Sequence, residues 1–275
     1  MGGDRPLVGT ALRDAWLRLH ADGRRAHEAA AALGVTEAEL VASTCTDAPG
    51  ALHATPLDVG DGAAFLSSLA ALGVVKTQTR SECVVLEVVG AYPEGRVEAR
   101  PEAWGALFAV RENAARVQRT SLQLFDVSGA AVQKIYLLGE SDEAAFERLV
   151  LARRLMDLTV PRAEAMPAAA PVATEAGDSW PLRRLLRTLA TARATITVLV
   201  DNRGVRHTRD ITLRRMTAKN DWLALVDRDA KILIHRATRA HARGGDAPSV
   251  TLSGEAGPGA LLTRLPESAL SPLDR

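Results

Sequence analysis

Residues 119–137 read RTSLQLFDVSGAAVQKIYL, and they carry the strongest structural signal in the chain. In segments 121–126 and 131–137 apolar residues recur at alternating positions, which is the period of a β-strand with one buried face. Residues 127–130 lie between these segments, include Gly129, and form a connection short enough to join two antiparallel neighbours. The sequence therefore predicts a β-hairpin here.

Further elements are predicted on both sides of this hairpin. Upstream, the β-branched run 83–89 and the segment 104–110 indicate strands. Downstream, a period of 3.6 residues begins at Ser141, the expected N-cap of a helix that has Asp142 and Glu143 in its first turn. The first 72 residues are mostly helical in pattern, and Thr36 with Glu39 forms a capping box at the start of one of these helices.

A second structured half follows a segment of low complexity. Residues 159–180 hold Pro161, Pro167 and Pro171 among alanines, and this composition predicts a linker. Beyond it, the pattern predicts a short helix and then strands near 196–200, 211, 222–226, 232–234 and 249–252. The expected division is a helical segment with a first α+β repeat over 1–158, a linker over 159–180, a shorter second repeat over 181–257 and a loose tail over 258–275.

The two halves show a faint likeness to each other. The run WGALFAV at 104–110 resembles WLALV at 222–226, and each follows an apolar strand and a glycine turn. Such self-similarity favours an internal duplication. The predicted fold class is α+β, with two similar repeats, each a largely antiparallel sheet carrying helices, joined by the Ala/Pro-rich linker.

Composition restricts the class of protein. The 275 residues are 47% hydrophobic and 24% charged, and 34 Lys and Arg against 33 Asp and Glu leave a net charge of +1. A surface for nucleic acid normally shows as a basic excess, so nucleic acid is disfavoured as a partner. Cys45 and Cys83 lie outside any metal-binding spacing, and neither a signal-peptide core nor an apolar run of membrane-spanning length is present. We expect a cytoplasmic protein with no membrane span.

The hairpin also resembles a block known from a protein family. Residues 119–137 are similar to the R-x-S-L-Q-F-F-D-x-x-G-x-A-V-H-K-[IV]-Y-L block of the hemin-degrading factors, the cytoplasmic haem-utilisation or hemin transport proteins. Residues 72–80, LGVVKTQTR, resemble that family's L-G-x-V-x-x-x-T-R segment, and AAAALGVTEAEL at 29–40 also fits. In the second half, ITVLVDNRG at 196–204 and WLALVDRD at 222–229 follow the order of the family's second repeat. The chain is identified as a shortened and divergent member.

This resemblance implies both a fold and a role. Family members fold as two α+β repeats with haem, iron protoporphyrin IX, in a cleft between sheet and helices. They accept haem from an inner-membrane haem transporter and pass it to a haem oxygenase, and some are reported to open the ring themselves. For this chain the resemblance implies haem as ligand and cofactor, the transporter and the oxygenase as partners, and a homodimer as an expected assembly.

The chain departs from the family's motifs where the family has histidines. No histidine occurs in 159–189, where the family has its usual axial ligand. Gln133 replaces the histidine of the hairpin, and Arg209 stands where the second repeat has one. A different axial donor is therefore expected.

Haem requires an apolar slot, an axial donor and cations for two propionates. Arg100 fits the family's propionate-side arginine, with Arg96 as the fallback, and a solvated arginine is the alternative for both. His207 is the candidate metal ligand, and a surface-loop histidine is the blander alternative that we prefer. Lys134, Tyr136 and Arg209 complete the candidate set of haem-binding residues. His235 and His241 lie among arginines and can form a basic strip for propionates, although a solvated strand edge is the preferred interpretation.

Several functions stay open at this point. A haem carrier is preferred over a haem-cleaving enzyme, because no secure axial histidine is visible and the iron itself supplies the chemistry of ring cleavage. A degenerate member that binds another tetrapyrrole or none is a further alternative. Residues 29–40 also fit a helix-turn-helix DNA binder, but Glu37 and Glu39 stand where phosphate would approach.

Overall fold

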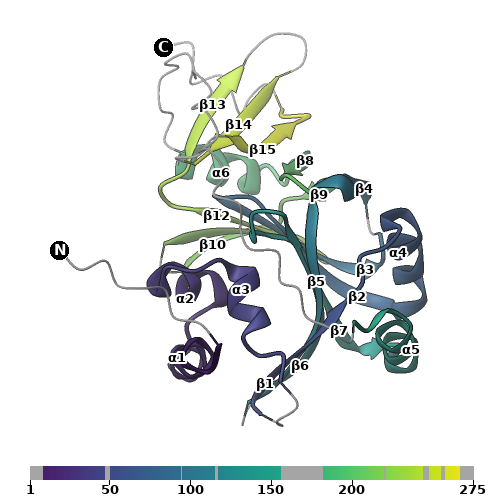
Figure 1. Ribbon diagram of the computed structural model, residues 1–275. Helices are drawn as coiled ribbons and strands as arrows, with labels where there is room; N and C mark the ends of the chain where they lie inside the picture. The colour runs from purple at the N-terminus through teal and green to yellow at the C-terminus, as the bar shows by residue number, and fades with distance from the viewer. Residues whose placement is uncertain are drawn as a thin grey trace, which may run out of the picture. The chain divides into compact units, whose positions relative to one another are not determined.

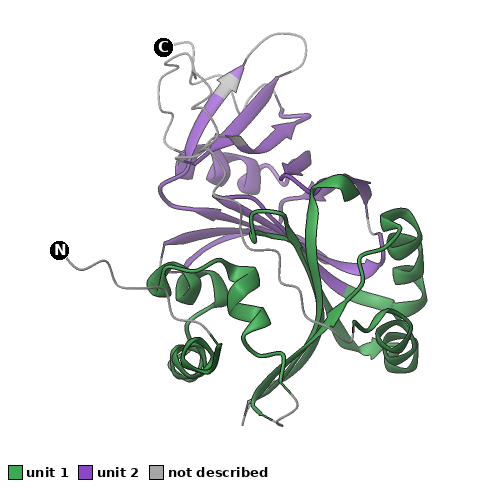
Figure 2. Ribbon diagram, viewed as in Figure 1, with its two compact units in different colours: residues 1–75, 100–166 green, residues 76–99, 167–275 purple. Residues whose placement is uncertain are grey.

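The structure is a computed structural model that describes residues 9–46, 50–93, 95–114, 117–155, 182–219, 221–243, 248–254 and 258–266. Two compact units are present, and the chain passes between them more than once (Figure 2). Unit 1 comprises residues 1–75 and 100–166, and unit 2 comprises residues 76–99 and 167–275. The linker expected over 159–180 lies outside the described residues.

Unit 1 is an antiparallel sheet with helices (Figure 1). Its sheet strands are hydrogen-bonded in the order β1-β5-β6-β7. The elements of this unit are α1 (Gly9–Ala21), α2 (Ala26–Leu33), α3 (Glu37–Ala42), β1 (Leu52–Leu57), α4 (Gly62–Ser68), the 3-10 turns η1 (Leu69–Leu72) and η2 (Pro101–Ala103), β5 (Trp104–Ala114), β6 (Val117–Asp126), β7 (Ala131–Ser141) and α5 (Glu143–Arg153).

Helices α1 to α3 cover one face of this sheet. Trp16 of α1 and Leu40 of α3 share a buried cluster with Phe108 of β5 and Phe125 of β6, whose rings meet edge to face at 5.9 Å. The predicted capping box is confirmed, because Thr36 Oγ1 accepts from the Glu39 N–H at 3.1 Å and Glu39 Oε2 accepts from the Thr36 N–H at 2.8 Å. Burial of its apolar residues leaves α3 no free face for a DNA groove, which weighs against the helix-turn-helix alternative.

The predicted hairpin is confirmed as β6 and β7, with Leu122 opposite Ile135 and Gln123 opposite Lys134. The helix that follows differs from the prediction in its first residue. Ser141 ends β7, and the N-cap is Asp142, whose Oδ1 accepts from the Ala145 N–H at 2.8 Å. A carboxylate is favoured at this end of a helix by the same hydrogen bonding that a serine would offer.

Within the described residues, unit 2 contains two layers of antiparallel strands and one helix. Its elements are β3 (Val84–Ala91), β4 (Arg96–Ala99), α6 (Leu182–Thr191), β8 (Thr195–Asp201), β9 (Val205–Thr212), β10 (Arg215–Lys219), β11 (Trp222–Val226), β12 (Ala230–His235), β13 (Arg239–Arg243), β14 (Ser249–Ser253) and β15 (Pro258–Thr263); β2 (Gly73–Arg80) starts in unit 1 and continues into unit 2. One layer has the order β2-β3-β12-β11-β10, and the other has the order β13-β14-β15-β8-β9-β4.

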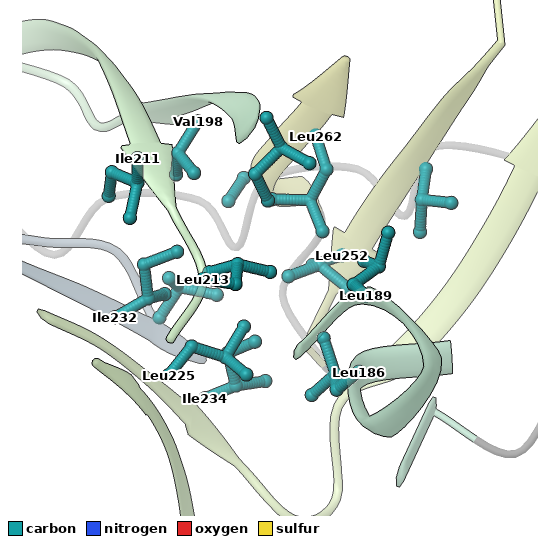
Figure 3. Packing of buried hydrophobic residues seen from close by; sticks show 14 of the residues in the cluster. Leu186, Leu189, Val198, Ile211, Leu213, Leu225, Ile232, Ile234, Leu252 and Leu262 are labelled. Carbon is teal, nitrogen blue, oxygen red and sulfur yellow. The ribbon is translucent and has the colours of Figure 1, made fainter. Parts of the chain in front are cut away.

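A single apolar core lies between these layers. Figure 3 shows Leu186 and Leu189 of α6 pointing at side chains from both layers, such as Ile234 of β12 and Leu252 of β14. Every second residue of β8, beginning at Ile196, is fully buried in this core. Helix α6 thus closes the core with its four leucines: Leu182, Leu185, Leu186 and Leu189.

Two parts of the expected division differ from the structure. The loose tail expected from residue 258 begins instead with β15, which pairs with both β14 and β8. Residues 76–99, expected in the first module, lie in unit 2, where β3 pairs with β12 and β4 pairs with β9. Antiparallel α+β architecture is confirmed, and each unit contains an antiparallel meander, β5–β6–β7 or β13–β14–β15.

Candidate functional site

His207 lies inside unit 2, in the middle of β9. Its residue surface is 1% exposed, and its Nδ1 is 2.8 Å from Thr79 Oγ1. Gly95 has a φ of +90°, and a Cβ placed there would stand 3.4 Å from His207 Nε2 and 2.7 Å from the Thr208 carbonyl oxygen. The backbone at Gly95 therefore passes close to the imidazole, and the surface-loop interpretation of His207 is wrong.

Two predicted arginines flank His207 on the same pair of strands. Arg96 of β4 stands opposite Thr208, and its Nε is 3.1 Å from Glu98 Oε1 with the side chain 79% exposed. Arg209 is 13% exposed, and its Nη2 is 2.6 Å from Asp229 Oδ2. Each guanidinium thus faces a carboxylate that compensates its charge.

Lys134 and Tyr136 lie two residues apart on β7 of unit 1, so their side chains share one face of the sheet. Lys134 forms an ion pair with Glu37 of α3, and its Nζ is 5.9 Å from the centre of the Phe125 ring. Arg119 lies over the Tyr136 ring at 5.6 Å, and burial raises the pKa of the Tyr136 hydroxyl. Both residues therefore take part in contacts that hold unit 1 together.

Arg100 stands at the start of η2, where its carbonyl oxygen accepts from the Ala103 N–H at 3.0 Å. This turn packs directly on α4, because a Cβ at Gly62 would come within 2.6 Å of Pro101 and 2.8 Å of Trp104. Trp104 in turn meets Phe65 of α4 edge to face at 6.2 Å. Tight packing on α4 therefore fixes the backbone at Arg100.

The predicted site residues thus fall in two groups. Arg100, Lys134 and Tyr136 belong to unit 1, whereas Arg96, His207 and Arg209 belong to unit 2. The structure places the second group on the paired strands β4 and β9, with Arg96 on the face opposite to that of His207 and Arg209, and it places Lys134 beside Tyr136 on β7. Within the described ranges, no cluster of three or more His, Cys, Asp or Glu residues is placed to hold a metal ion.

The sequence interpretation underrated one residue, His241. Both of its ring nitrogens are buried without a hydrogen-bond partner, as is the hydroxyl of Ser253 on the neighbouring strand. A solvated strand edge is therefore the wrong interpretation for His241. The signal that marks it is the alternating run RAHAR at 239–243, which puts one histidine and two arginines on the same face of a strand.

None of the helices in the described part of the chain combines the length and the apolar character that a membrane span requires.

Comparisons with known proteins agree with this architecture. Residues 34–152 match the model of the haemin-degrading HemS/ChuX domain. The hemin transport protein HemS of Yersinia enterocolitica is 28% identical over 182 residues, which cover 60% of this chain and 50% of that protein. The chain thus spans about half the length of this relative.

Two solved structures share the fold over nearly the whole chain. The heme degrading enzyme ChuS of Escherichia coli O157:H7 is 20% identical, with 93% of both chains covered and a TM-score of 0.79. The heme-binding protein PhuS of Pseudomonas aeruginosa, in its holo form, is 24% identical, with 93% of both chains covered and a TM-score of 0.76. Residues 34–152 of this chain thus resemble the haemin-degrading HemS/ChuX domain, and the chain shares its fold with ChuS and PhuS.

Proposed function

We propose that this chain binds haem in the cytoplasm and takes part in haem utilisation for iron acquisition. The observation that carries this proposal is the HemS/ChuX domain over residues 34–152. The relatives that share the sequence or the fold include a hemin transport protein and a heme-binding protein, by their names.

We infer further that the chain carries haem and does not cleave it. When bound, haem supplies iron chemistry, and the protein contributes ligation, orientation and shielding from water. No histidine occurs in 159–189, where the resemblance places the usual axial ligand, and this departure favours a carrier. An inner-membrane haem transporter as donor, a haem oxygenase as acceptor and a homodimer as the assembly belong to this proposal.

Of the residues predicted from sequence, Arg100 is the candidate for a propionate. Its backbone is held by the η2 turn on α4, so its side chain starts from a fixed point. A guanidinium can donate two parallel hydrogen bonds to a carboxylate, which is the geometry that a propionate requires.

Titration of the purified chain with hemin tests the proposal. We expect a Soret band that shifts and saturates at one equivalent of hemin per chain. With a reductant and catalase present, a carrier keeps this band, whereas a haem-cleaving enzyme loses it and forms a biliverdin-like product. A titration curve that equals that of free hemin in buffer contradicts haem binding, and loss of the band contradicts the carrier role alone.

The haem-cleaving enzyme remains the second candidate. The solved structure of ChuS carries the words heme degrading enzyme in its name, and it shares the fold of this chain. The titration with a reductant separates the two candidates within a single experiment.

A further inference from the structure

The β13–β14 pair of unit 2 has one apolar and one polar face. Ala240, Val250 and Leu252 point into the core of unit 2. Arg239, His241 and Arg243 point the other way, because successive side chains of a strand alternate between faces. Residues directly opposite each other on paired strands share a face. Ser253, Thr251 and Ser249 of β14 therefore lie on the same face as these three side chains of β13. We call this set the β13–β14 strip: Arg239, His241, Arg243, Ser249, Thr251 and Ser253.

Polar atoms in the β13–β14 strip lack partners where partners are expected. Nδ1 and Nε2 of His241 are both buried with no hydrogen bond, and the same holds for Oγ of Ser253, a residue that is only 5% exposed. Buried polar groups are hydrogen-bonded in the great majority of cases, and leaving one unpaired costs free energy. An imidazole with two such nitrogens therefore points to a ligand or metal that takes one of them.

Two cations without an ion-pair partner among the described residues border this histidine. Arg239 and Arg243 are both exposed, and no carboxylate within the described ranges forms an ion pair with either. In contrast, the nearby Arg236 is held by Asp221 at 2.9 Å. The strip therefore offers two guanidiniums, one on each side of an imidazole, to an anionic ligand.

Apolar side chains continue the same face toward the middle of the sheet. Thr251 stands opposite Leu261 of β15, and Leu261 stands opposite Leu199 of β8. Both leucines are partly exposed, whereas their neighbours Leu262 and Val198 are buried in the core on the other face. From β13 to β8 the face spans three strand spacings, or about 14 Å. A flat apolar ligand with anionic groups at one edge matches this surface.

We propose that His241 is the axial ligand of haem in this chain, with Leu261 and Leu199 under the macrocycle and with Arg239 and Arg243, in place of the sequence candidate Arg100, at the propionates. This inference rests on the proposed function. An imidazole nitrogen is a common protein donor to haem iron, and guanidiniums suit the carboxylates of the propionates. His241 lies on the outermost strand of its sheet among the described strands.

His207 is the competing donor, and its surroundings differ. It faces the interior of unit 2, it is 1% exposed, and Thr79 holds its Nδ1. Strands β8 and β4 flank it on both sides, opposite Val200 and Val97. Haem would have to part the core of unit 2 to reach His207, whereas the ring of His241 stands at an edge.

Hemin titration of matched variants tests the assignment. We expect His241→Ala to change the ferric Soret and electron paramagnetic resonance spectra and to weaken hemin binding at least about tenfold, the loss seen when even an outer partner of a metal ligand is removed. Added imidazole should restore the spectrum. The control variants His235→Ala and Arg236→Gln come from the same segment and should leave both readouts unchanged, because His235 and Arg236 contact Trp222 and Asp221.

Metal-free protoporphyrin IX separates ligation from propionate binding. Without iron, His241→Ala should bind protoporphyrin like the wild type, whereas Arg239→Gln and Arg243→Gln should each weaken it about tenfold through the loss of a charge-assisted hydrogen bond. His241→Gln serves as a second variant that keeps a polar side chain, and circular dichroism checks that every variant is folded.

The outcomes distinguish this inference from the proposed function. If the wild type does not bind hemin, the proposed function fails and the inference falls with it. If the wild type binds hemin and folded His241→Ala and His241→Gln give the wild-type spectrum, only the inference is overturned. A change of spectrum in His207→Ala, with none in His241→Ala, also overturns it in favour of His207.

Discussion

His207 and Arg100 are expected to respond differently to substitution. His207 fills a buried position against Thr79 and Gly95, so His207→Ala should destabilise the protein by about 2 kcal/mol through a lost hydrogen bond and a cavity. If Arg100 binds a propionate, Arg100→Ala should weaken hemin binding more than His207→Ala does. Urea unfolding and hemin titration of both variants check this pair of expectations, and equal hemin affinities would contradict the role of Arg100.

Substituting one residue of the Lys134–Glu37 ion pair should destabilise the protein more than substituting both. The pair is largely buried, with side chains 16% and 8% exposed, so Lys134→Met leaves an uncompensated carboxylate inside unit 1. We expect a loss of about 3 kcal/mol in the free energy of unfolding for this variant. The double variant Lys134→Met with Glu37→Leu removes both charges and should recover most of the loss. A double variant as unstable as the single one would show that packing, not charge, governs this contact.

Asp227 should make unit 2 sensitive to acid. Burial alone would raise the pKa of its carboxyl, but hydrogen bonds from the Thr212 N–H, the Arg214 side chain and the Arg228 N–H outweigh burial and lower the pKa. Stability from a carboxyl with a depressed pKa is present above its unfolded pKa and is lost as the pH falls through the folded one.

The variant Asp227→Asn isolates this effect. Wild type should lose stability as the pH falls below the ordinary range of an aspartate, and the variant should lose less over the same interval. Asp221→Asn is the matched control, since Asp221 is 60% exposed in an ion pair with Arg236. Thermal unfolding between pH 7 and pH 3 measures the slopes, and parallel slopes for wild type and Asp227→Asn would contradict this origin.

Among the helices, α4 depends on a glycine for its packing. In a helix, Gly62→Ala would normally add stability, because alanine has the higher helix propensity. Here the added Cβ would meet Pro101 at 2.6 Å and Trp104 at 2.8 Å, so we expect a net loss of about 1–3 kcal/mol. Gly139→Ala on β7 is the control, because its Cβ would have no neighbour within 4 Å. Thermal unfolding compares the stability of the two variants. A Gly62→Ala variant more stable than the wild type would show that η2 moves away from the added Cβ at little cost.

Local signals predicted individual elements well. The Thr36–Glu39 capping box and the 119–137 hairpin involve residues close in sequence, and both are present as expected. The N-cap at Asp142 was missed by one residue, because Ser141 and Asp142 both have capping side chains. Strand β15 was missed because its sequence, PGALLT, carries glycine and proline and gains its partners β14 and β8 only in the folded sheet.

The composition of the candidate site was harder to predict than the elements. Pairing of β9 with β4, about a hundred residues apart in sequence, buries His207, and no local pattern reports such pairing. The partners of Lys134 and Arg209, Glu37 and Asp229, also come from other elements. His241 was visible as a histidine between two arginines, but only the structure shows that its nitrogens are buried and unpaired.

At the scale of the whole molecule, each unit contains one of the two cysteines. Cys45 belongs to unit 1, where burial raises its thiol pKa to about 12, and Cys83 belongs to unit 2, where burial also raises the pKa. Thiol reagents attack the thiolate, so the native protein should react very slowly at pH 8 with either. Pulsed labelling in rising urea should then report each unit by its own cysteine, with Cys45→Ser and Cys83→Ser variants assigning the signals. Rapid labelling of the native protein would contradict the burial of these thiols.

Residues 76–99 belong to unit 2, although the chain before and after them belongs to unit 1. This arrangement has a consequence for synthesis on the ribosome. Strands β3 and β4 emerge early, but β9 and β12, which hydrogen-bond to them, follow more than a hundred residues later. At ordinary elongation rates this interval lasts on the order of 10 s, during which the nascent chain bears unpaired strand edges. Co-translational folding can therefore complete the helical layer over the β5–β6 strands first, while the nascent β3–β4 arm depends on holding chaperones until its late partners arrive.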